Sequence, residues 1–236
     1  MDVEILKPNE STVPVLSFEF FPPNTPEGLV KLRTTRQALA ALDPAYFSVT
    51  FGAGGSTRDK TLGVVAEIAA EGLDVAPHLT CVGATRSNIV DLLDDYRSRG
   101  IRRLVALRGD LPSGMVGQGD FRYASDLIAF IRKYSGDHFK LEVAAYPEMH
   151  PQAPSPQHDL DNFLRKAEAG ADSAITQYFF NATAYFDFVD RVRARGCELP
   201  IIPGIMPITN YTQLARFSDA CGAEIPRWVR LRLASF

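Results

Sequence analysis

Short apolar runs of strand length alternate with longer segments of helical periodicity along most of the chain. Seven apolar runs predict strands, at residues 15–20, 46–50, 75–79, 103–107, 141–145, 173–178 and 199–202. Helical patterns separate them, at residues 26–42, 57–71, 87–99, 124–134, 156–169 and 182–195. Strands that are apolar throughout and alternate with helices are typical of a parallel sheet covered by helices. The pattern therefore predicts an α/β fold.

The spacing of the strands favours a barrel over an open doubly wound sheet. Strand starts recur roughly every 30 residues, the length of one βαβ unit. The first strand is not followed by the Gly-x-Gly-x-x-Gly turn of a dinucleotide-binding sheet, and the length of 236 residues suits a (β/α)₈ TIM barrel. Residues 226–233 predict an amphipathic helix, so the eighth strand and its helix are expected to be missing. We expect residues 1–236 to form a single, C-terminally incomplete barrel domain.

Composition narrows the partners and the compartment. A formal net charge of −3 and a pI near 5.8 give no basic footprint for nucleic acid. The longest apolar runs have strand length and the N-terminus lacks a long apolar core, so neither a membrane partner nor a signal peptide is expected. Three widely separated cysteines, Cys81, Cys197 and Cys221, do not suggest a disulfide framework. A cytoplasmic protein is the expectation.

Glu19 is the most informative single residue, because it interrupts an apolar strand. Side chains alternate faces along a strand, so Phe18 and Phe20 should point one way and Glu19 the other. Burial would raise the pKa of this carboxyl group and would suit a proton donor near neutral pH. A structural glutamate held by an arginine or by backbone N–H groups is the alternative. The residues alone leave both interpretations open.

Other polar residues fall at the predicted carboxyl ends of the strands, where TIM barrels carry their active sites. They are Glu19, Thr50, His78, Arg108, Asp110, Tyr146, Glu148, His150, Gln177 and the segment 203–210. This concentration predicts one concave site to which every strand contributes.

The same segments carry a resemblance to a known family. The motifs are SFEFFPP at 17–23, SVTFGAGGS at 48–56, PHLTC at 77–81, ALRGDLP at 106–112, AYPEMHP at 145–151, ITQYFF at 175–180 and IPGIMP at 202–207. Together they resemble the methylenetetrahydrofolate reductases, from residue 16 to about residue 233. The resemblance implies a TIM-barrel flavoenzyme that uses FAD, with NADH or NADPH as co-substrate. It would reduce the folate 5,10-methylenetetrahydrofolate to 5-methyltetrahydrofolate in one-carbon and methionine metabolism, and it leaves a homo-oligomer open.

The resemblance also implies roles for individual residues. Glu19 matches the general acid that opens the folate ring, and Asp110 matches a carboxylate near both flavin and pterin. Gln177 and Gln213 match folate contacts, and Phe217 matches a ring that packs against bound folate or nicotinamide. The residues implied to bind FAD are Thr50, Ala53, His78, Arg108, Gly109, Asp110, Tyr123, Ala124, Tyr146, His150, Ala153, Asp159, Asn162, Arg165 and Lys166. Two adjacent cations at 165 and 166 suit a diphosphate; a solvated helix face is the alternative for them.

Other chemistries fit the sequence less well. His78 and Cys81 leave a zinc site incomplete, so we expect no metal. Lys140 and Lys166 lie outside the strands that point into the mouth, which disfavours a Schiff-base lysine. The alternative hypothesis from a different class is a non-catalytic or impaired flavin- or folate-binding barrel, because the eighth strand is expected to be missing.

Overall fold

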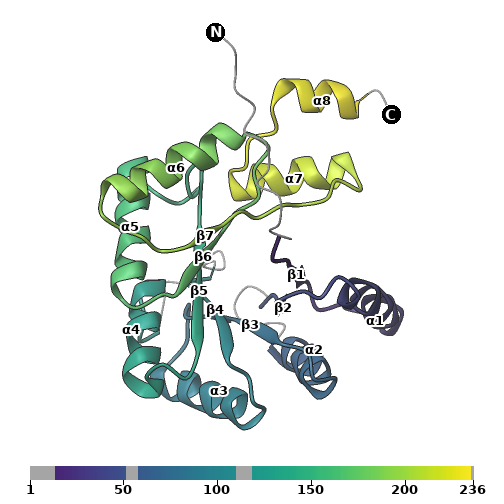
Figure 1. The fold of residues 1–236 in the computed structure, drawn as a ribbon, viewed down its shortest axis with the longest axis vertical. Helices are drawn as coiled ribbons and strands as arrows, with labels where there is room; N and C mark the ends of the chain where they lie inside the picture. The colour runs from purple at the N-terminus through teal and green to yellow at the C-terminus, as the bar shows by residue number, and fades with distance from the viewer. Residues whose placement is uncertain (1–13, 52–57, 110–118, 235–236) are drawn as a thin grey trace.

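The computed structural model describes residues 14–51, 58–109 and 119–234, and it contains seven strands and eight helices in these ranges (Figure 1). The strands are β1 (Ser17–Phe20), β2 (Tyr46–Val49), β3 (Val75–Thr80), β4 (Arg103–Leu107), β5 (Lys140–Ala145), β6 (Ser173–Thr176) and β7 (Ile201–Ile202). The helices are α1 (Pro26–Ala40), α2 (Arg58–Ala70), α3 (Arg86–Ser98), α4 (Ala124–Ser135), α5 (Pro156–Glu168), α6 (Ala182–Ala194), α7 (Tyr211–Cys221) and α8 (Arg227–Leu233).

The strands form one parallel sheet in the order β1-β2-β3-β4-β5-β6-β7. The sheet is curved, and α1 to α6 lie around its outer side (Figure 1). The predicted α/β fold, a barrel built from seven βα units, is confirmed. Among the described residues β1 pairs only with β2 and β7 only with β6, so the curved sheet is not closed into a ring.

Helix starts are set by short polar side chains at the carboxyl ends of the strands. The side-chain oxygens of Thr25, Thr85, Ser155, Asn181 and Asn210 each accept a hydrogen bond from a backbone N–H in the first turn of α1, α3, α5, α6 and α7. Because each helix starts after a strand ends, these turns lie at the same end of the barrel. The sequence therefore places its helix N-termini and its polar loops at one mouth.

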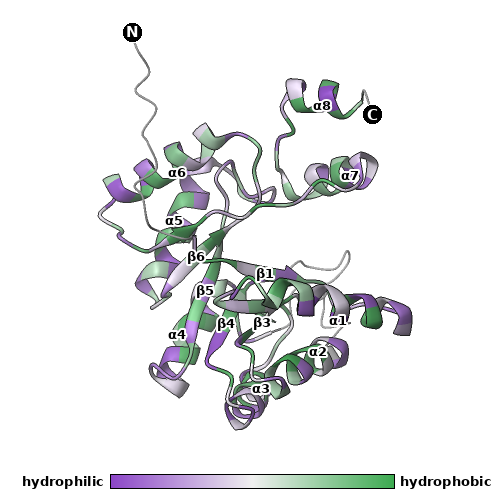
Figure 2. Ribbon diagram, turned by 45° about the vertical axis from the view of Figure 1, so that its right-hand side comes forward, coloured by the Kyte–Doolittle hydropathy of each residue, from purple (hydrophilic) through white to green (hydrophobic). Residues whose placement is uncertain are grey.

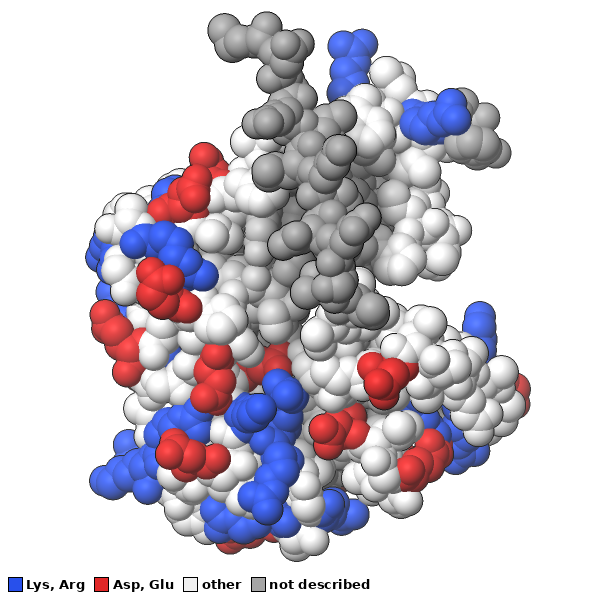
Figure 3. Space-filling model, in the orientation of Figure 1, with Lys and Arg blue, Asp and Glu red and all other residues white. Residues whose placement is uncertain are grey.

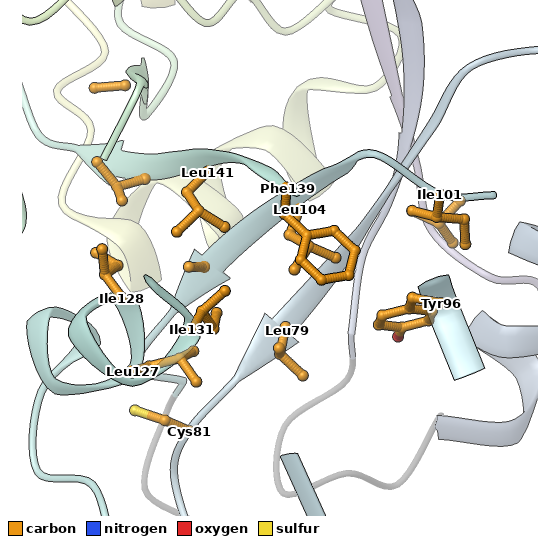
Figure 4. Close-up of a cluster of buried hydrophobic side chains, with 14 of the residues drawn as sticks. Leu79, Cys81, Tyr96, Ile101, Leu104, Leu127, Ile128, Ile131, Phe139 and Leu141 are labelled. Atoms are coloured by element: carbon orange, nitrogen blue, oxygen red, sulfur yellow. The ribbon is translucent and has the colours of Figure 1, made fainter. Parts of the chain in front are cut away.

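The main core lies between the sheet and the helices that cover it. Its buried hydrophobic residues come from β2 to β6 and from α1 to α6, which carry many of the hydrophobic positions coloured green in Figure 2. Leu79 and Leu104 from β3 and β4 pack with Leu127 and Ile131 of α4, and all four side chains are almost fully buried (Figure 4). Such close packing fixes the strands against the helices, and with them the positions of the residues at the mouth.

A polar cluster fills the interior of the sheet one layer below the mouth. The Tyr46 hydroxyl donates to Glu142 at 2.5 Å, and Arg103 Nη1 donates to the other carboxylate oxygen, also at 2.5 Å. The Arg103 guanidinium lies 4.4 Å from the centre of the Tyr46 ring. Glu142 is fully buried, so both partners are needed to compensate its charge. These side chains join β2, β4 and β5 across the interior.

The sequence analysis did not assign α7. Its first turn is capped by Asn210, and Leu214 and Ser218 form its buried stripe at a spacing of four residues. This helix packs with α8 in a second cluster, whose buried members are Tyr178, Leu214, Ala223, Ile225 and Val229. α7 and α8 lie side by side beyond the β7 end of the sheet (Figures 1 and 2). The second cluster is thus separate from the main core.

Candidate functional site

A cavity of about 410 Å³ opens inside the curve of the sheet, at the carboxyl ends of the strands. Its wall includes Glu19, Thr50, His78, Tyr146 and Gln177, from five different strands or the loops that follow them. The apolar residues Phe21, Ile205, Met206 and Phe217 border it. The structure therefore brings five of the polar residues predicted for one concave mouth into this cavity, while Arg108 and His150 border a second one, Glu148 borders neither, and Asp110 lies outside the described residues.

Glu19 points into this central cavity. The rings of Phe18 and Phe20 pack on Phe47 in the main core, and their centres lie 6.1 and 5.6 Å, respectively, from the centre of the Phe47 ring. Because side chains alternate along the strand, Glu19 points the other way. Its side chain is 46% exposed. The expectation of a buried carboxylate was wrong, because the curved sheet surrounds an open cavity here and not a packed interior.

His78 is the partner of Glu19 in the central cavity. Its Nε2 lies 3.2 Å from Oε2 of Glu19, and its side chain is only 8% exposed. Partial burial raises the pKa of Glu19, but the interaction with His78 outweighs it and holds that pKa below the ordinary value. The expected upward shift was therefore wrong. The residue that reverses it lies two strands away, 59 positions later in the sequence.

One side of the central cavity is aromatic. The rings of Phe217 on α7 and Tyr178 after β6 are stacked, with centres 5.9 Å apart and planes 16° from parallel. Phe217 is 41% exposed, and the Tyr178 hydroxyl lies 2.8 Å from Ser218 Oγ. The exposed ring offers a flat surface to a planar ligand.

Gln177 and Gln213 take different positions. Gln177 borders the central cavity, and its Oε1 accepts from the backbone N–H of Tyr178 at 3.0 Å. This bond uses the oxygen, so the side-chain NH₂ group is the part left for other contacts. Gln213 lies exposed on α7 and is not part of the cavity wall among the described residues. Gln213 and Phe217 are four residues apart, so both lie on the same side of the helix.

The loop after β7 lies close to β6 at the edge of this cavity. A Cβ atom on Gly204 would stand 2.2 Å from the carbonyl oxygen of Thr176, and the Gly204 N–H donates to Thr176 Oγ1 at 2.9 Å. Only glycine fits at this distance. The close approach places Ile205 and Met206 at the cavity rim.

A second cavity of about 290 Å³ lies beside the first, between the ends of β4 and β5 and the starts of α4 and α5. Nine of the residues implied to bind FAD border it: Arg108, Tyr123, Ala124, Tyr146, His150, Ala153, Asp159, Asn162 and Lys166. Tyr146 also borders the central cavity, so the two cavities meet at this residue. The Tyr146 and His150 rings pack edge to face, with centres 4.5 Å apart.

The polar groups of the second cavity are held by local contacts. Asp159 accepts from the His150 backbone N–H at 2.8 Å, and Arg108 donates to the side chain of Gln152. Lys166 donates to the carbonyl oxygen of Ala144. Burial lowers the pKa of Lys166 to about 8, against an opposing effect of the Asp159 carboxylate. The wall thus offers two cations, Arg108 and Lys166, to an anionic ligand.

Several residues implied to bind FAD lie elsewhere. Thr50 and His78 border the central cavity, while Gly109 borders neither cavity and lies next to Thr80. Arg165 is exposed near the end of α5 and donates to Asn162 Oδ1 at 2.5 Å, so it reaches the second cavity only through that neighbour. Ala53 and Asp110 lie outside the described residues.

The sequence analysis missed four residues of the second cavity: Ser125, Gln152, Pro154 and His158. Ser125 and His158 are in the first turns of α4 and α5, and the expected start of each helix was a usable signal for them. Gln152 is found only through its contact with Arg108, which is 44 residues away in the sequence.

Cys81 and Lys140, two groups weighed for other chemistries, lie in surroundings that do not suit them, whereas Lys166 borders the second cavity. The described residues contain no group of three His, Cys, Asp or Glu side chains able to hold a metal ion. Burial raises the pKa of Cys81 to about 11, which keeps it a thiol. Lys140 lies at the start of β5, the opposite end of the strand from the site. Within the described part of the chain, no helix is both long and apolar enough to cross a bilayer.

Acidic and basic side chains are interspersed over the face seen in Figure 3, while the part of α7 visible there is largely uncharged. Because charges of both signs are mixed on this face, we expect the charged residues of the site, and not a long-range surface potential, to attract a ligand.

Comparison with known proteins places the chain in a family. Residues 5–236 match the family model described as methylenetetrahydrofolate reductase. The 5,10-methylenetetrahydrofolate reductase of Salmonella typhimurium is 45% identical over 217 residues, which are 92% of this chain and 72% of that protein. Methylenetetrahydrofolate reductase (NADH) 1 of Arabidopsis thaliana is 38% identical, over 89% of this chain and 38% of its own length.

A solved structure shares the fold. An uncharacterized protein from Clostridium thermocellum, which binds two copies of 5-methyl-5,6,7,8-tetrahydrofolic acid, superposes with a TM-score of 0.63 at 18% identity. The match covers 94% of this chain and 76% of that one. The fold, the family model and the curated relatives agree, and the chain belongs to the methylenetetrahydrofolate reductase family.

Proposed function

We propose that this member of the family reduces 5,10-methylenetetrahydrofolate to 5-methyltetrahydrofolate, with FAD as its resident cofactor and NADH or NADPH as the electron source. The observation that carries the proposal is the position of Glu19 in a cavity that joins a second, cation-lined cavity at Tyr146. A proton donor and a cofactor site thus share one wall. Because the curated relatives are reductases, we favour an enzyme over a non-catalytic binding barrel.

The second cavity fits the polar half of FAD. Arg108 and Lys166 supply positive charge for a diphosphate, and Asn162 and Asp159 supply a donor and acceptors for a ribose or an adenine. Tyr146 and His150 form an aromatic corner where the two cavities meet. When bound, the flavin would supply the hydride that the methylene carbon of the folate accepts.

Thr50 and His78 would hold the part of the cofactor nearest the central cavity, whose wall they form, and Gly109 keeps its proposed role from the family motif. Arg165 would act through Asn162. Ala53 and Asp110 keep their proposed roles from the family motifs alone: Ala53 in a turn that approaches the cofactor, and Asp110 as a carboxylate near both cofactor and folate.

Glu19 would give its proton to the bridging nitrogen of the folate, which opens the five-membered ring and leaves the methylene carbon electrophilic. The low pKa of Glu19 applies to a cavity open to water. A bound folate would displace that water, and the loss of solvation would raise the pKa towards the range a donor needs. His78, 3.2 Å away, is placed to return the proton.

Phe217 would pack on the flat ring system of the folate, with Tyr178 stacked behind it. Gln177 would hydrogen-bond to the ring from the cavity wall, and Gln213 from the exposed side of α7. The folate substrate therefore lies, in this proposal, between β1 with Glu19 on one side and α7 on the other.

The name of one relative bears on the choice between NADH and NADPH. The Arabidopsis relative carries NADH in its name, and we propose NADH as the preferred donor here. The three cysteines are all free thiols, which suits the cytoplasmic location that we propose.

The proposal is tested with the purified protein. It should bind added FAD and turn yellow, bleach without oxygen on addition of NADH faster than with NADPH, and regain its colour with 5,10-methylenetetrahydrofolate. A protein that binds FAD but transfers no electrons to the folate would exclude the reductase. Faster bleaching by NADPH would overturn the nicotinamide preference only.

A further inference from the structure

Glu148, in the loop between β5 and α5, borders neither of the two cavities. Its Oε2 accepts the backbone N–H of Glu224 at 2.9 Å. Its Oε1 is buried and has no hydrogen-bond partner among the described residues. Burial raises the pKa of this carboxyl group, although the Glu224 N–H opposes the shift. A carboxylate kept in such surroundings for one backbone hydrogen bond needs an explanation.

The bonded partner belongs to the segment between α7 and α8. Ala223 and Ile225, on either side of Glu224, are 6% and 2% exposed and anchor that segment in the second cluster. Glu224 lies beyond the end of α7, so its N–H has no carbonyl partner within the helix. The carboxylate of Glu148 accepts this hydrogen bond instead. Glu148 thereby ties the end of α7 to the loop after β5.

A second contact joins the same two segments. Gly222 ends α7 with φ of 75°. A Cβ atom there would stand 3.1 Å from Pro151 Cγ and 3.2 Å from the Met149 carbonyl oxygen. The helix end is therefore pressed against residues 149–151 of the loop that carries His150. One loop contacts the second cavity on one side and α7 on the other.

α7 needs such a tie because it stands apart from the main core. Its buried residues pack in the second cluster with Tyr178 and α8, and it lies beyond the β7 end of the sheet (Figure 1). It nevertheless carries Phe217, which borders the central cavity on top of Tyr178. A small movement of α7 would move this ring relative to Glu19.

We propose that Glu148 is a positioning residue for the folate side of the site: its hydrogen bond to Glu224 holds α7 in place, and with it Phe217 over the central cavity. The inference rests on the proposed function for its kinetic consequence. Its structural consequence, a less firmly held α7, does not depend on any activity.

Two substitutions separate the acceptor from the charge. Glu148→Ala removes the acceptor of the Glu224 N–H, whereas Glu148→Gln keeps a carbonyl oxygen that can accept it. Glu224→Ala is the matched control, because it removes an exposed side chain and keeps the backbone N–H that Glu148 binds.

The activity-independent measurement is hydrogen exchange with FAD present. Glu148→Ala should speed exchange of the amides of 211–233 about tenfold and leave those of α3 and α4 unchanged, since one charged hydrogen bond is lost locally. Glu148→Gln and Glu224→Ala should exchange like the original protein. Equal exchange in Glu148→Ala, or a uniform increase over the whole chain, would overturn the proposal.

The kinetic measurement adds the link to folate. Glu148→Ala should raise KM for 5,10-methylenetetrahydrofolate about tenfold, with the rate of flavin bleaching by NADH unchanged, and Glu148→Gln should restore KM. Equal losses in both half-reactions would show a merely structural residue. If the original protein reduces no folate, the proposed function fails, while the exchange result still decides the role of Glu148.

Discussion

Glu19 and His78 form the chemical centre of the site. They come from β1 and β3. In the register of the sheet Glu19 pairs with Ser48 of β2 and Ser48 with Ala76 of β3, two residues before His78. Because residues two apart on a strand share a face, both side chains point into the curve of the sheet, and a carboxylate and an imidazole separated by 59 positions lie 3.2 Å apart. The interaction with His78 sets the protonation of Glu19 in the open cavity. A ligand that excludes water would change the strength of this interaction.

Replacement of Glu19 tests its role as the proton donor. Glu19→Gln keeps the size of the side chain but cannot donate an acidic proton, so the rate of folate reduction should fall by a factor of about 10²–10⁴. Flavin reduction by NADH, which needs no proton from Glu19, should stay within about twofold. Stopped-flow absorbance of the two half-reactions measures both rates.

The matched control is Glu27→Gln, at an exposed glutamate in the first turn of α1. It should leave both half-reactions unchanged. If Glu19→Gln slowed both half-reactions equally, Glu19 would be a structural residue and not the acid.

Among the elements, the junction of α4, β5 and β6 shows how a single side chain can organise the framework. Arg132 near the end of α4 donates to the carbonyl oxygens of Gly170 and Phe139 at 2.8 Å each. It also donates to Asp172 at 2.5 Å, and Asp172 accepts the Leu141 N–H at 2.6 Å. The side chains of Arg132 and Asp172 are 18% and 47% exposed, so the bonds to the two carbonyl oxygens are partly shielded from water while the ion pair is half-exposed.

Removal of this arginine should destabilise the fold without touching the site. Arg132→Ala is expected to lower the free energy of unfolding by about 2–4 kcal/mol, because it leaves shielded carbonyl groups and a carboxylate without their donor. The neighbouring Lys133→Ala, at an exposed position, should change it by less than about 0.5 kcal/mol. Urea unfolding compares the two, and equal effects would refute the junction's importance.

At the scale of the whole molecule, stability should depend on pH through paired carboxylates. Glu67 of α2 accepts hydrogen bonds from Arg33 and Arg36 of α1, and the bonds from Arg33 first and Arg36 second hold its pKa below the ordinary value despite partial burial. The stability that Glu67 contributes is therefore fully present above the unfolded-state pKa and is lost as pH falls through the lower folded-state pKa.

Acid titration of stability measures this contribution. The free energy of unfolding should fall as the pH drops below the ordinary glutamate pKa of about 4.3. Glu67→Gln should lower it by about 2 kcal/mol at pH 7 and flatten its slope in the acid range. Glu198→Gln, at a carboxylate that is 82% exposed, serves as the control. An unchanged slope in Glu67→Gln would show that the pair with α1 contributes nothing.

Particular residues show how far the sequence reached. Thr25, Thr85 and Ser155 cap helices close to where their patterns predicted the starts, since capping is local. α7 escaped because its apolar stripe is short and packs on a second cluster and not on the sheet. Gln152 was not predicted as a site residue because its only signal is a contact with Arg108. Both depend on partners that are distant in sequence.

The sequence by itself determined the order of strands and helices, the alternation that turns Glu19 away from Phe18 and Phe20, and the family motifs at the mouth. These properties follow from short-range periodicity and from residues a few positions apart. Only the tertiary structure decided that Glu19 is half-exposed, that His78 lowers its pKa, and that two cavities meet at Tyr146. Exposure and charge interactions depend on distances through space, which the curvature of the sheet sets and no local pattern encodes.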